Sequence, residues 1–370
     1  MRRAVRLVSF HILQKRRLSR FAFCLGLLCA VVLVLASAPS IAQTANPLPI
    51  PLYGPLGISP IAVRQGTLGS CYFHASIAAV AKANPAAIRK AIGGDAKNGY
   101  RVHFASGPDE TVYVEDVEYG RAHSYDKSEG QWVTVLMRAY AQRALRENMV
   151  QAINRSTAIP VWVKPVTLTA LDEPGPLLVA YDRAIRSVVG QDGQLDKTKF
   201  QPALSSQLAS LGVPTVEAEA LGSLLEQAGF YEALQSAVRD NGEVFGAYET
   251  LNQGGIPVKV LRAIMGAAQA TMIMTSTLSA QLQSVHAGGT AMVARSRNAA
   301  PESALQSGKA PDWFVPGHAY TVLDYDAADG TVLLRNPWGA HPGPNGIFRL
   351  PRSVFEQSYS SYSYSVGTAR

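Results

Sequence analysis

Cysteine is nearly absent from the chain, with three in 370 residues. Two of them, Cys24 and Cys29, lie in an apolar run near the N-terminus, so a chain without that run keeps Cys71 alone. A single thiol excludes an internal disulfide framework. A zinc site at Cys71 and His74 would need further Cys or His at close spacing, and these are absent. The remaining thiol is therefore a candidate for a reactive group.

The chain also lacks a basic surplus outside its N-terminal segment. The formal net charge is +7, but residues 1–42 carry seven of the 34 Lys and Arg and none of the 27 Asp and Glu. The rest of the chain thus has 27 residues of each sign. Net charge gives no indication of a nucleic-acid partner, and we predict none.

Long apolar runs are scarce as well, and the one that stands out lies at residues 21–36 after a basic stretch. It is shorter than the ~20 residues of a spanning helix. Ser40 and Ala42 then offer a small-residue cleavage site, so residues 1–42 are predicted to be a signal peptide and the protein to be exported, secreted or periplasmic. If the segment is retained, residues 21–36 anchor the protein in a membrane, which is the alternative localisation.

The pattern before residue 290 is mainly helical. Residues 43–60 are rich in Pro and Gly and predict an extended arm. Helices are expected at 71–83, 132–144, 204–211 and 216–238, with a hairpin over 100–119 turning at 106–109. The apolar stretch 258–278 is ambiguous, and we expect a soluble helix pair there.

Strand patterns follow at 291–294, 318–325, 331–335, 346–350 and 362–367, with Asp329 and Gly330 as a hairpin turn. A helical N-terminal lobe and a C-terminal lobe built on an antiparallel sheet make an α+β protein. A ligand site is expected in a cleft between the lobes.

Cys71 lies where a Gly-containing loop, QGTLGS, meets an apolar helical run. At a helix N-terminus, unpaired backbone N–H groups and the helix dipole favour a thiolate and lower the pKa of a thiol. The sequence thus predicts an activated nucleophile.

The nucleophile needs a base, and His318 in VPGHAYTVLDYD opens a predicted strand. The next strand ends in LRNPWG, where the side-chain oxygen of Asn336 can accept from the imidazole and orient it. Gln65, six residues before Cys71, can supply an amide N–H to an oxyanion hole together with the Cys71 backbone N–H. The other histidines are weaker candidates: His74 follows no strand, and no adjacent orienter is visible in the sequence for His103, His123, His286 and His341.

These stretches resemble the calpain family. QGTLGSCYFHASIAAVA is similar to the opening motif of the calpain catalytic core, GHAYTVLDYD to its His motif and LRNPWG to its Asn motif. Further matches are QWVTVLMRAYAQ, AYETLNQGG and the closing GIFRLPRSVFEQSYSSYSYSV. The resemblance covers most of residues 58–366 and implies a papain-like two-lobe fold.

The resemblance also implies roles and boundaries. Cys71 would be the nucleophile, His318 the general base and acid, Asn336 the orienter and Gln65 the oxyanion donor, with Trp338 shielding the Asn–His pair from water. Substrate is expected to bind at Gly254, Gly255 and Gly317. The lobes would span 61–142 and 247–370, with a helical insertion at 143–246.

The sequence departs from the family at several points. Ser70 and Tyr72 stand where calpains usually have Asp and Trp, and the acidic residues that bind calcium in animal calpains are missing. We therefore expect no cofactor and no metal site, with calcium dependence doubtful.

The leading interpretation is an exported cysteine endopeptidase acting on polypeptides through a thioester acyl-enzyme. Two alternatives stay open. One is a catalytically degenerate binding module, and the other is a thiol-dependent acyl or amide transferase, because papain-like folds host such chemistry.

Overall fold

The computed structural model describes residues 50–155, 176–188, 197–212, 247–273, 277–305 and 308–366. The predicted signal peptide, the start of the extended arm and the predicted helix at 216–238 lie outside these ranges. Within them, no helix combines the length and apolar character that a membrane crossing requires.

The protein is α+β with antiparallel sheets, as predicted. Helices are α2 Cys71–Ala83, α3 Pro85–Ala91, α4 Val114–Ala122, α5 Trp132–Arg155, α7 Pro176–Val188, α8 Lys197–Ser210, α11 Pro257–Met265, α12 Leu278–His286 and α13 Arg352–Ser358, with 3₁₀ turns η1 Pro60–Ala62, η2 Glu249–Gln253, η3 Glu302–Ala304 and η4 Pro344–Gly346. Strands are β1 Ile92–Asp95, β2 Gly99–Val102, β3 Glu110–Val112, β4 Ala268–Met272, β5 Met292–Ser296, β6 Ala319–Asp326, β7 Thr331–Arg335, β8 Ile347–Pro351 and β9 Tyr359–Ser365.

The strands form two sheets. Strands β1 to β3 make a small sheet in chain order, and the other six pair in the order β4-β9-β5-β6-β7-β8. The five predicted C-terminal strands are all present in the larger sheet, displaced by up to three residues at one end. Strand β4 was not predicted.

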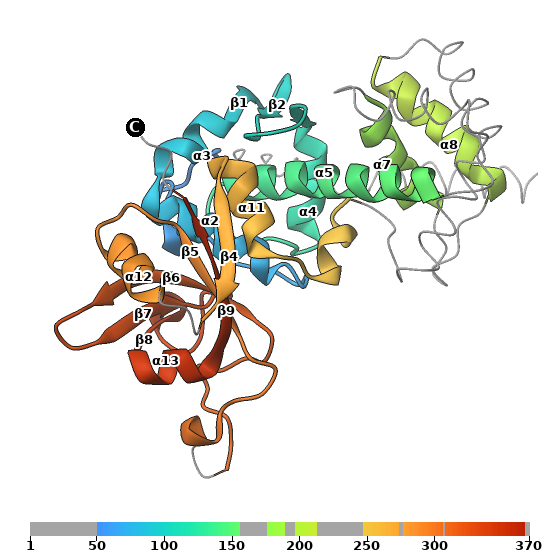
Figure 1. Cartoon of the computed structure of the whole chain (residues 1–370). Coiled ribbons are helices and arrows are strands. Elements are labelled where there is room, and N and C mark those ends of the chain that lie inside the picture. The colour runs from blue at the N-terminus through green and yellow to red at the C-terminus, as the bar shows by residue number, and fades with distance from the viewer. Residues whose placement is uncertain are drawn as a thin grey trace, which may run out of the picture. The chain divides into compact units, whose positions relative to one another are not determined.

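Helix α2 is the element that carries Cys71, and it is buried on every side. All residues from Tyr72 to Ala81 are buried, which explains the continuous apolar run in the sequence. The helix packs against β5, β6 and α11 (Figure 1). Thr321 of β6 donates a hydrogen bond of 2.9 Å to the Ala75 carbonyl. The helix is thus fixed to the sheet one turn beyond Cys71.

The central strands of the larger sheet are buried on both faces. In β6, Ala319 joins the core formed with α2, while Tyr320 and Val322 join a second core with α12 and α13. Neighbouring β5 alternates in the same way, because Val293 belongs to the first core and Met292 to the second. Side chains at alternate positions of these strands therefore face α2.

Helix α5 runs through residue 143, the predicted start of the insertion, without a break. It joins α7 through buried charges, since Arg138 of α5 lies 2.8 Å from Asp182 of α7. Burial alone would raise the pKa of Asp116 in α4, but Arg138 and two arginines of α7 outweigh it and hold the pKa below its usual value. The division of the chain into two lobes and an insertion stays a prediction.

Two of the secondary-structure predictions were partly wrong. The hairpin over 100–119 is real for β2 and β3, but Val114 begins helix α4. Glu115 and Asp116 in its first turn favour a helix there. The expected helix pair at 258–278 is a helix and a strand, because Gly266 adopts a φ of 81° that ends α11 and lets the chain enter β4.

Candidate active site

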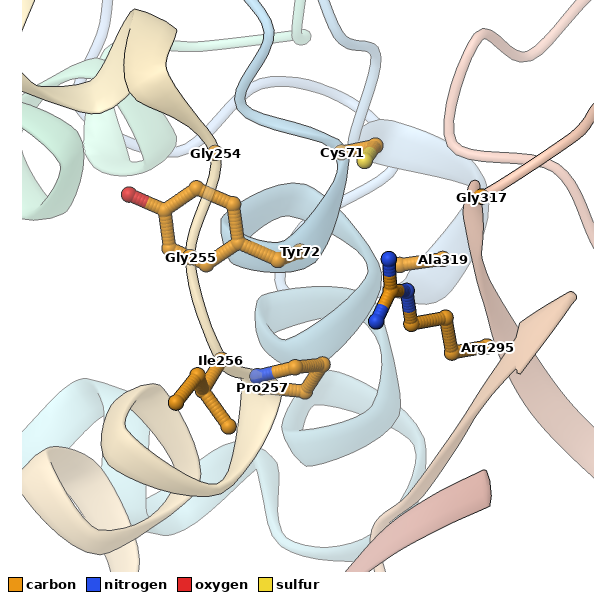
Figure 2. A pocket seen from close by; sticks show the side chains of 9 residues that line it. All are labelled: Cys71, Tyr72, Gly254, Gly255, Ile256, Pro257, Arg295, Gly317 and Ala319. Carbon is orange, nitrogen blue, oxygen red and sulfur yellow. The ribbon is translucent and has the colours of Figure 1, made fainter. Parts of the chain in front are cut away.

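Cys71 opens into a cavity of about 340 Å³ (Figure 2). The walls come from four separate segments: Cys71, Tyr72, Gly254, Gly255, Ile256, Pro257, Arg295, Gly317 and Ala319. The three glycines predicted to bind substrate all lie here. The only thiol among the described residues thus faces a space large enough for a side chain.

Glycine at position 255 has a steric reason. A Cβ atom there would lie 2.4 Å from the Tyr72 ring, which packs over this segment (Figure 2). Gly254 and Gly317 adopt positive φ values of 76° and 64°, a conformation that favours glycine. The backbone at these positions is therefore both exposed to the cavity and free of side chains.

The thiol itself is less activated than the sequence predicted. Burial raises the pKa of Cys71, and this effect outweighs the backbone N–H groups of Ala319, Tyr72 and Cys71 and the charge of Arg295, which lower it. The expectation of a thiolate stabilised by the helix N-terminus was therefore wrong for this state, since desolvation of the anion is the larger effect.

The orientation of Asn336 follows from its hydrogen bonds. Its Oδ1 accepts from the backbone N–H of Trp338 at 3.1 Å, so the oxygen faces inward. The same oxygen lies 3.0 Å from Nε2 of His318. Because Oδ1 can only accept, Nε2 carries the proton and the lone pair of the neutral ring is on Nδ1.

Nδ1 of His318 has no hydrogen bond to any residue in the described ranges, so a basic nitrogen is available. The His318 backbone is held from both sides by Ser296, whose hydroxyl accepts from the His318 N–H at 2.9 Å and donates to the Val315 carbonyl. Burial lowers the pKa of His318 to about 4, against a smaller opposing effect of the Asn336 hydrogen bond. The ring is thus neutral at pH 7.

Cys71 and His318 lie on neighbouring elements, α2 and the residue before β6, without a hydrogen bond between them. Gly317 and Ala319, on either side of the histidine, line the cavity with Cys71. No hydrogen bond between the Cys71 thiol and His318 exists in the described structure. The cavity therefore holds the thiol, and the residues on either side of His318 border it, while the imidazole itself is not among its walls.

Trp338 lies against this pair, with its ring centroid 4.8 Å from that of His318. Asn336 is 1 % exposed and His318 6 %, whereas Trp338 is 42 % exposed. The indole thus separates the Asn–His hydrogen bond from water.

Gln65 is buried in the loop before α2, and its side-chain amide hydrogen-bonds to the protein itself. Its Nε2 donates to the Leu68 carbonyl at 2.7 Å, and its Oε1 is buried with no hydrogen-bond partner in the described residues. Its backbone N–H donates to the Pro337 carbonyl at 2.9 Å. Gln65 therefore ties the loop before Cys71 to the loop that carries Asn336, and one amide hydrogen remains for a ligand.

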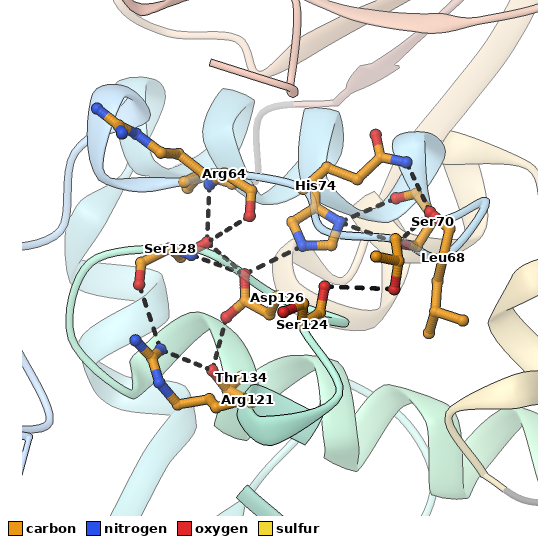
Figure 3. Close-up of polar contacts among 12 residues, drawn as sticks. Arg64, Leu68, Ser70, His74, Arg121, Ser124, Asp126, Ser128 and Thr134 are labelled. Carbon is orange, nitrogen blue, oxygen red and sulfur yellow. Dashed lines mark hydrogen bonds and ion pairs between the residues drawn. The ribbon is translucent and has the colours of Figure 1, made fainter. Parts of the chain in front are cut away.

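A buried polar network lies one helical turn beyond Cys71 (Figure 3). His74 places Nδ1 3.1 Å from the Ser70 carbonyl and Nε2 3.3 Å from Asp126. Asp126 also accepts from Ser128 and Thr134. Burial alone would raise the pKa of Asp126, but these partners outweigh it and hold the pKa below its usual value.

Nδ1 of His74 also lies 3.2 Å from the Ser70 hydroxyl, which can donate or accept a hydrogen bond. These contacts hold the first turn of α2 against the segment around Asp126.

The sequence argument against other histidines needs correction. His103 bonds Asp109 at 2.7 Å and His286 bonds Asp324 at 2.9 Å, so both have an orienter in space. Both rings are exposed and neither is among the cavity residues. The residues next to them in the chain also lie outside the cavity walls, unlike those next to His318, and this position rather than a missing partner excludes them as bases.

Arg295 is the charged residue of this cavity that sequence reasoning missed. In the sequence, Arg295 stands out only because it follows a predicted strand. The alternation of residues does not show which strands are neighbours, so its place beside Cys71 could not be predicted. Among the described residues, no group of three or more His, Cys, Asp or Glu could hold a metal ion.

No protein-family model and no curated protein matches the chain. Among solved structures, the selenomethionine derivative of PepW from Lactobacillus rhamnosis HN001 (DR20) is 12% identical, with a TM-score of 0.31 over 82% of this chain and 79% of that chain.

Proposed function

We propose that the protein is an exported cysteine endopeptidase with a papain-like, calpain-type catalytic core. The observation that carries the proposal is the free Nδ1 of His318, whose tautomer is fixed by Asn336 next to a cavity that holds Cys71. Nucleophile, base and orienter come from α2, the start of β6 and the end of β7.

In the proposed reaction, Nδ1 of His318 takes the thiol proton while Sγ of Cys71 bonds to the carbonyl carbon of a peptide. The oxyanion is assigned to the backbone N–H of Cys71 and the remaining amide hydrogen of Gln65. The C–N bond then breaks, and the imidazolium gives its proton to the leaving amine. Water attacks the thioester, His318 takes its proton, and the thiol is restored.

The neutral state of both groups shapes this mechanism. Because the pKa of Cys71 is raised and that of His318 is lowered, proton transfer accompanies attack on the substrate rather than preceding it. We expect the sulfur and Nδ1 to approach within hydrogen-bond distance in the substrate complex, since catalytic hydrogen bonds often shorten on binding.

The test is cleavage of an unfolded protein by the full chain and by Cys71→Ala. Cleavage should disappear in the variant while its far-UV circular dichroism and thermal midpoint are retained. Unchanged cleavage by Cys71→Ala would remove the nucleophile assignment.

A second candidate, a catalytically inert binding module, is favoured by the raised pKa of Cys71 and by the missing thiol–imidazole hydrogen bond. Alkylation separates the two, with the modified cysteine identified by mass spectrometry. A catalytic Cys71 should react with a peptide-based electrophile at least tenfold faster than with iodoacetamide, because only the former occupies the cavity. An inert thiol should show no such preference.

A further inference from the structure

The cavity beside Cys71 contains a single charged side chain. Arg295 is the one ionic residue among its walls, the others being glycines, apolar residues, Tyr72 and the thiol. Within the described ranges, the Arg295 guanidinium has no hydrogen bond or ion pair, and no Asp or Glu lines the cavity. Figure 2 shows this side chain reaching past Ala319 into the same space that Cys71 and Tyr72 face.

The position of Arg295 is built into the sheet. It is the residue directly opposite Ala319 in the β5–β6 pair, and cross-strand partners point to the same face. Ala319 packs toward α2, so Arg295 also faces that side. Its carbonyl accepts from Ser360 in β9, which holds the strand from the other edge. The cation is therefore placed on the site face by two neighbouring strands.

We propose that this cavity binds an acidic side chain, aspartate or glutamate, of the polypeptide substrate close to the cleaved bond. The inference rests on the proposed peptidase function and adds a substrate preference to it. Ile256, Pro257 and the Tyr72 ring would contact the methylene groups, and the Arg295 guanidinium would bind the carboxylate. A planar guanidinium can donate two parallel hydrogen bonds to a carboxylate.

The first experiment measures kcat/KM for peptide pairs that differ only by Glu or Gln at one position within three residues of the cleaved bond. Arg295 is exposed, so the effect is that of a solvated ion pair, and we expect glutamate to be preferred about fivefold at one position. Arg295→Gln should bring the ratio to about one, and Arg295→Glu should invert it in favour of glutamine. Arg101→Gln, at another exposed strand arginine in β2, should keep the wild-type ratio.

The second experiment does not depend on proteolysis. The rate of Cys71 alkylation by iodoacetate, an anion, is divided by the rate with neutral iodoacetamide. Arg295→Gln should lower this ratio about fivefold, and 0.5 M salt should lower it in the wild-type protein, because the attraction is screened.

The outcomes separate the two proposals. If Cys71-dependent cleavage is present but glutamate is not preferred at any position, or the alkylation ratio is unchanged in Arg295→Gln, the acidic subsite is wrong and the peptidase stands. If cleavage does not depend on Cys71, the peptidase proposal fails, and the substrate preference fails with it whatever the alkylation ratio. A glutamate preference that survives in Arg295→Gln would also overturn the assignment.

Discussion

Replacing Asn336 by alanine tests the arrangement on which the proposed chemistry depends. The change removes one oxygen that accepts two hydrogen bonds, from His318 Nε2 and from the Trp338 backbone N–H. In the transition state His318 is an imidazolium, so the first of these bonds is made to a charged group and contributes about 1.5–3 kcal/mol. We therefore expect kcat/KM to fall about 10- to 150-fold in Asn336→Ala.

The assay is hydrolysis of a fluorogenic peptide, with unfolding by urea measured in parallel. The second bond is lost at the same time, so the variant should also be destabilised by about 1–3 kcal/mol. Asn336→Asp keeps an acceptor and should recover part of the activity, while its carboxylate raises the pKa of His318 and moves the acid limb of the rate profile upward. Asn98→Ala, in an exposed turn, is the matched control.

If folded Asn336→Ala keeps kcat/KM within twofold of the wild-type value, the tautomer argument is refuted. An acid limb that does not move in Asn336→Asp would contradict it as well, because a purely structural asparagine has no reason to set the charge state of the base.

Two further predictions concern pH and stability. Burial lowers the pKa of His318 to about 4, so the base is neutral above that pH and kcat/KM should fall as the pH drops through it. In Trp338→Ala water reaches the ring, so the acid limb of the pH–rate profile should move toward the ordinary pKa of about 6.5. Asp126→Asn should destabilise the protein by about 1.5–3 kcal/mol at pH 7, because it removes the carboxylate facing His74, whereas Asp109→Asn in an exposed pair should cost less than about 1 kcal/mol.

The sign of the Asp126 effect follows from its lowered pKa. The stabilisation is complete above the unfolded value of about 3.9 and is lost as pH falls through the folded pKa, so Asp126→Asn and wild type should converge in acid. A constant difference at all pH values would show that packing, not charge, is responsible. If the acid limb of the pH–rate profile stays near pH 4 in Trp338→Ala, the indole does not shield His318 from water.

The candidate site could be named from the sequence because its parts are local. Cys71 follows a glycine loop and opens an apolar helix, and Asn336 ends a strand before Pro337, so each position is set by its immediate neighbours. The alternation of β6 and β7 is equally local. These features placed most of the larger sheet correctly, with Cys71 at the start of α2 and Asn336 directly after β7.

What the sequence could not supply depends on distant contacts. The pKa of Cys71 is raised by burial under segments 180 or more residues away along the chain, such as the one that carries Gly255. Arg295 reaches the cavity because β5 pairs with β6 at Ala319, a register no local pattern reveals. Val112 and Val114 fit a strand by alternation, whereas Val114 and Val117 fit a helix by spacing, and the acidic first turn of α4 decided between them.

The strand order β4-β9-β5 has a consequence for how the molecule is assembled. Strand β4 enters the sheet only through β9, with Ala268 opposite Ser365, so its pairing waits until the last strand has been made. Strands β5 to β8 can pair earlier and already hold His318, Asn336 and Arg295. Helix α11, which leads into β4 and begins at the cavity wall, is joined to the sheet by a long-range closure that is slow to form. His318, Asn336 and Arg295 would therefore be positioned by the sheet before β4 joins its edge.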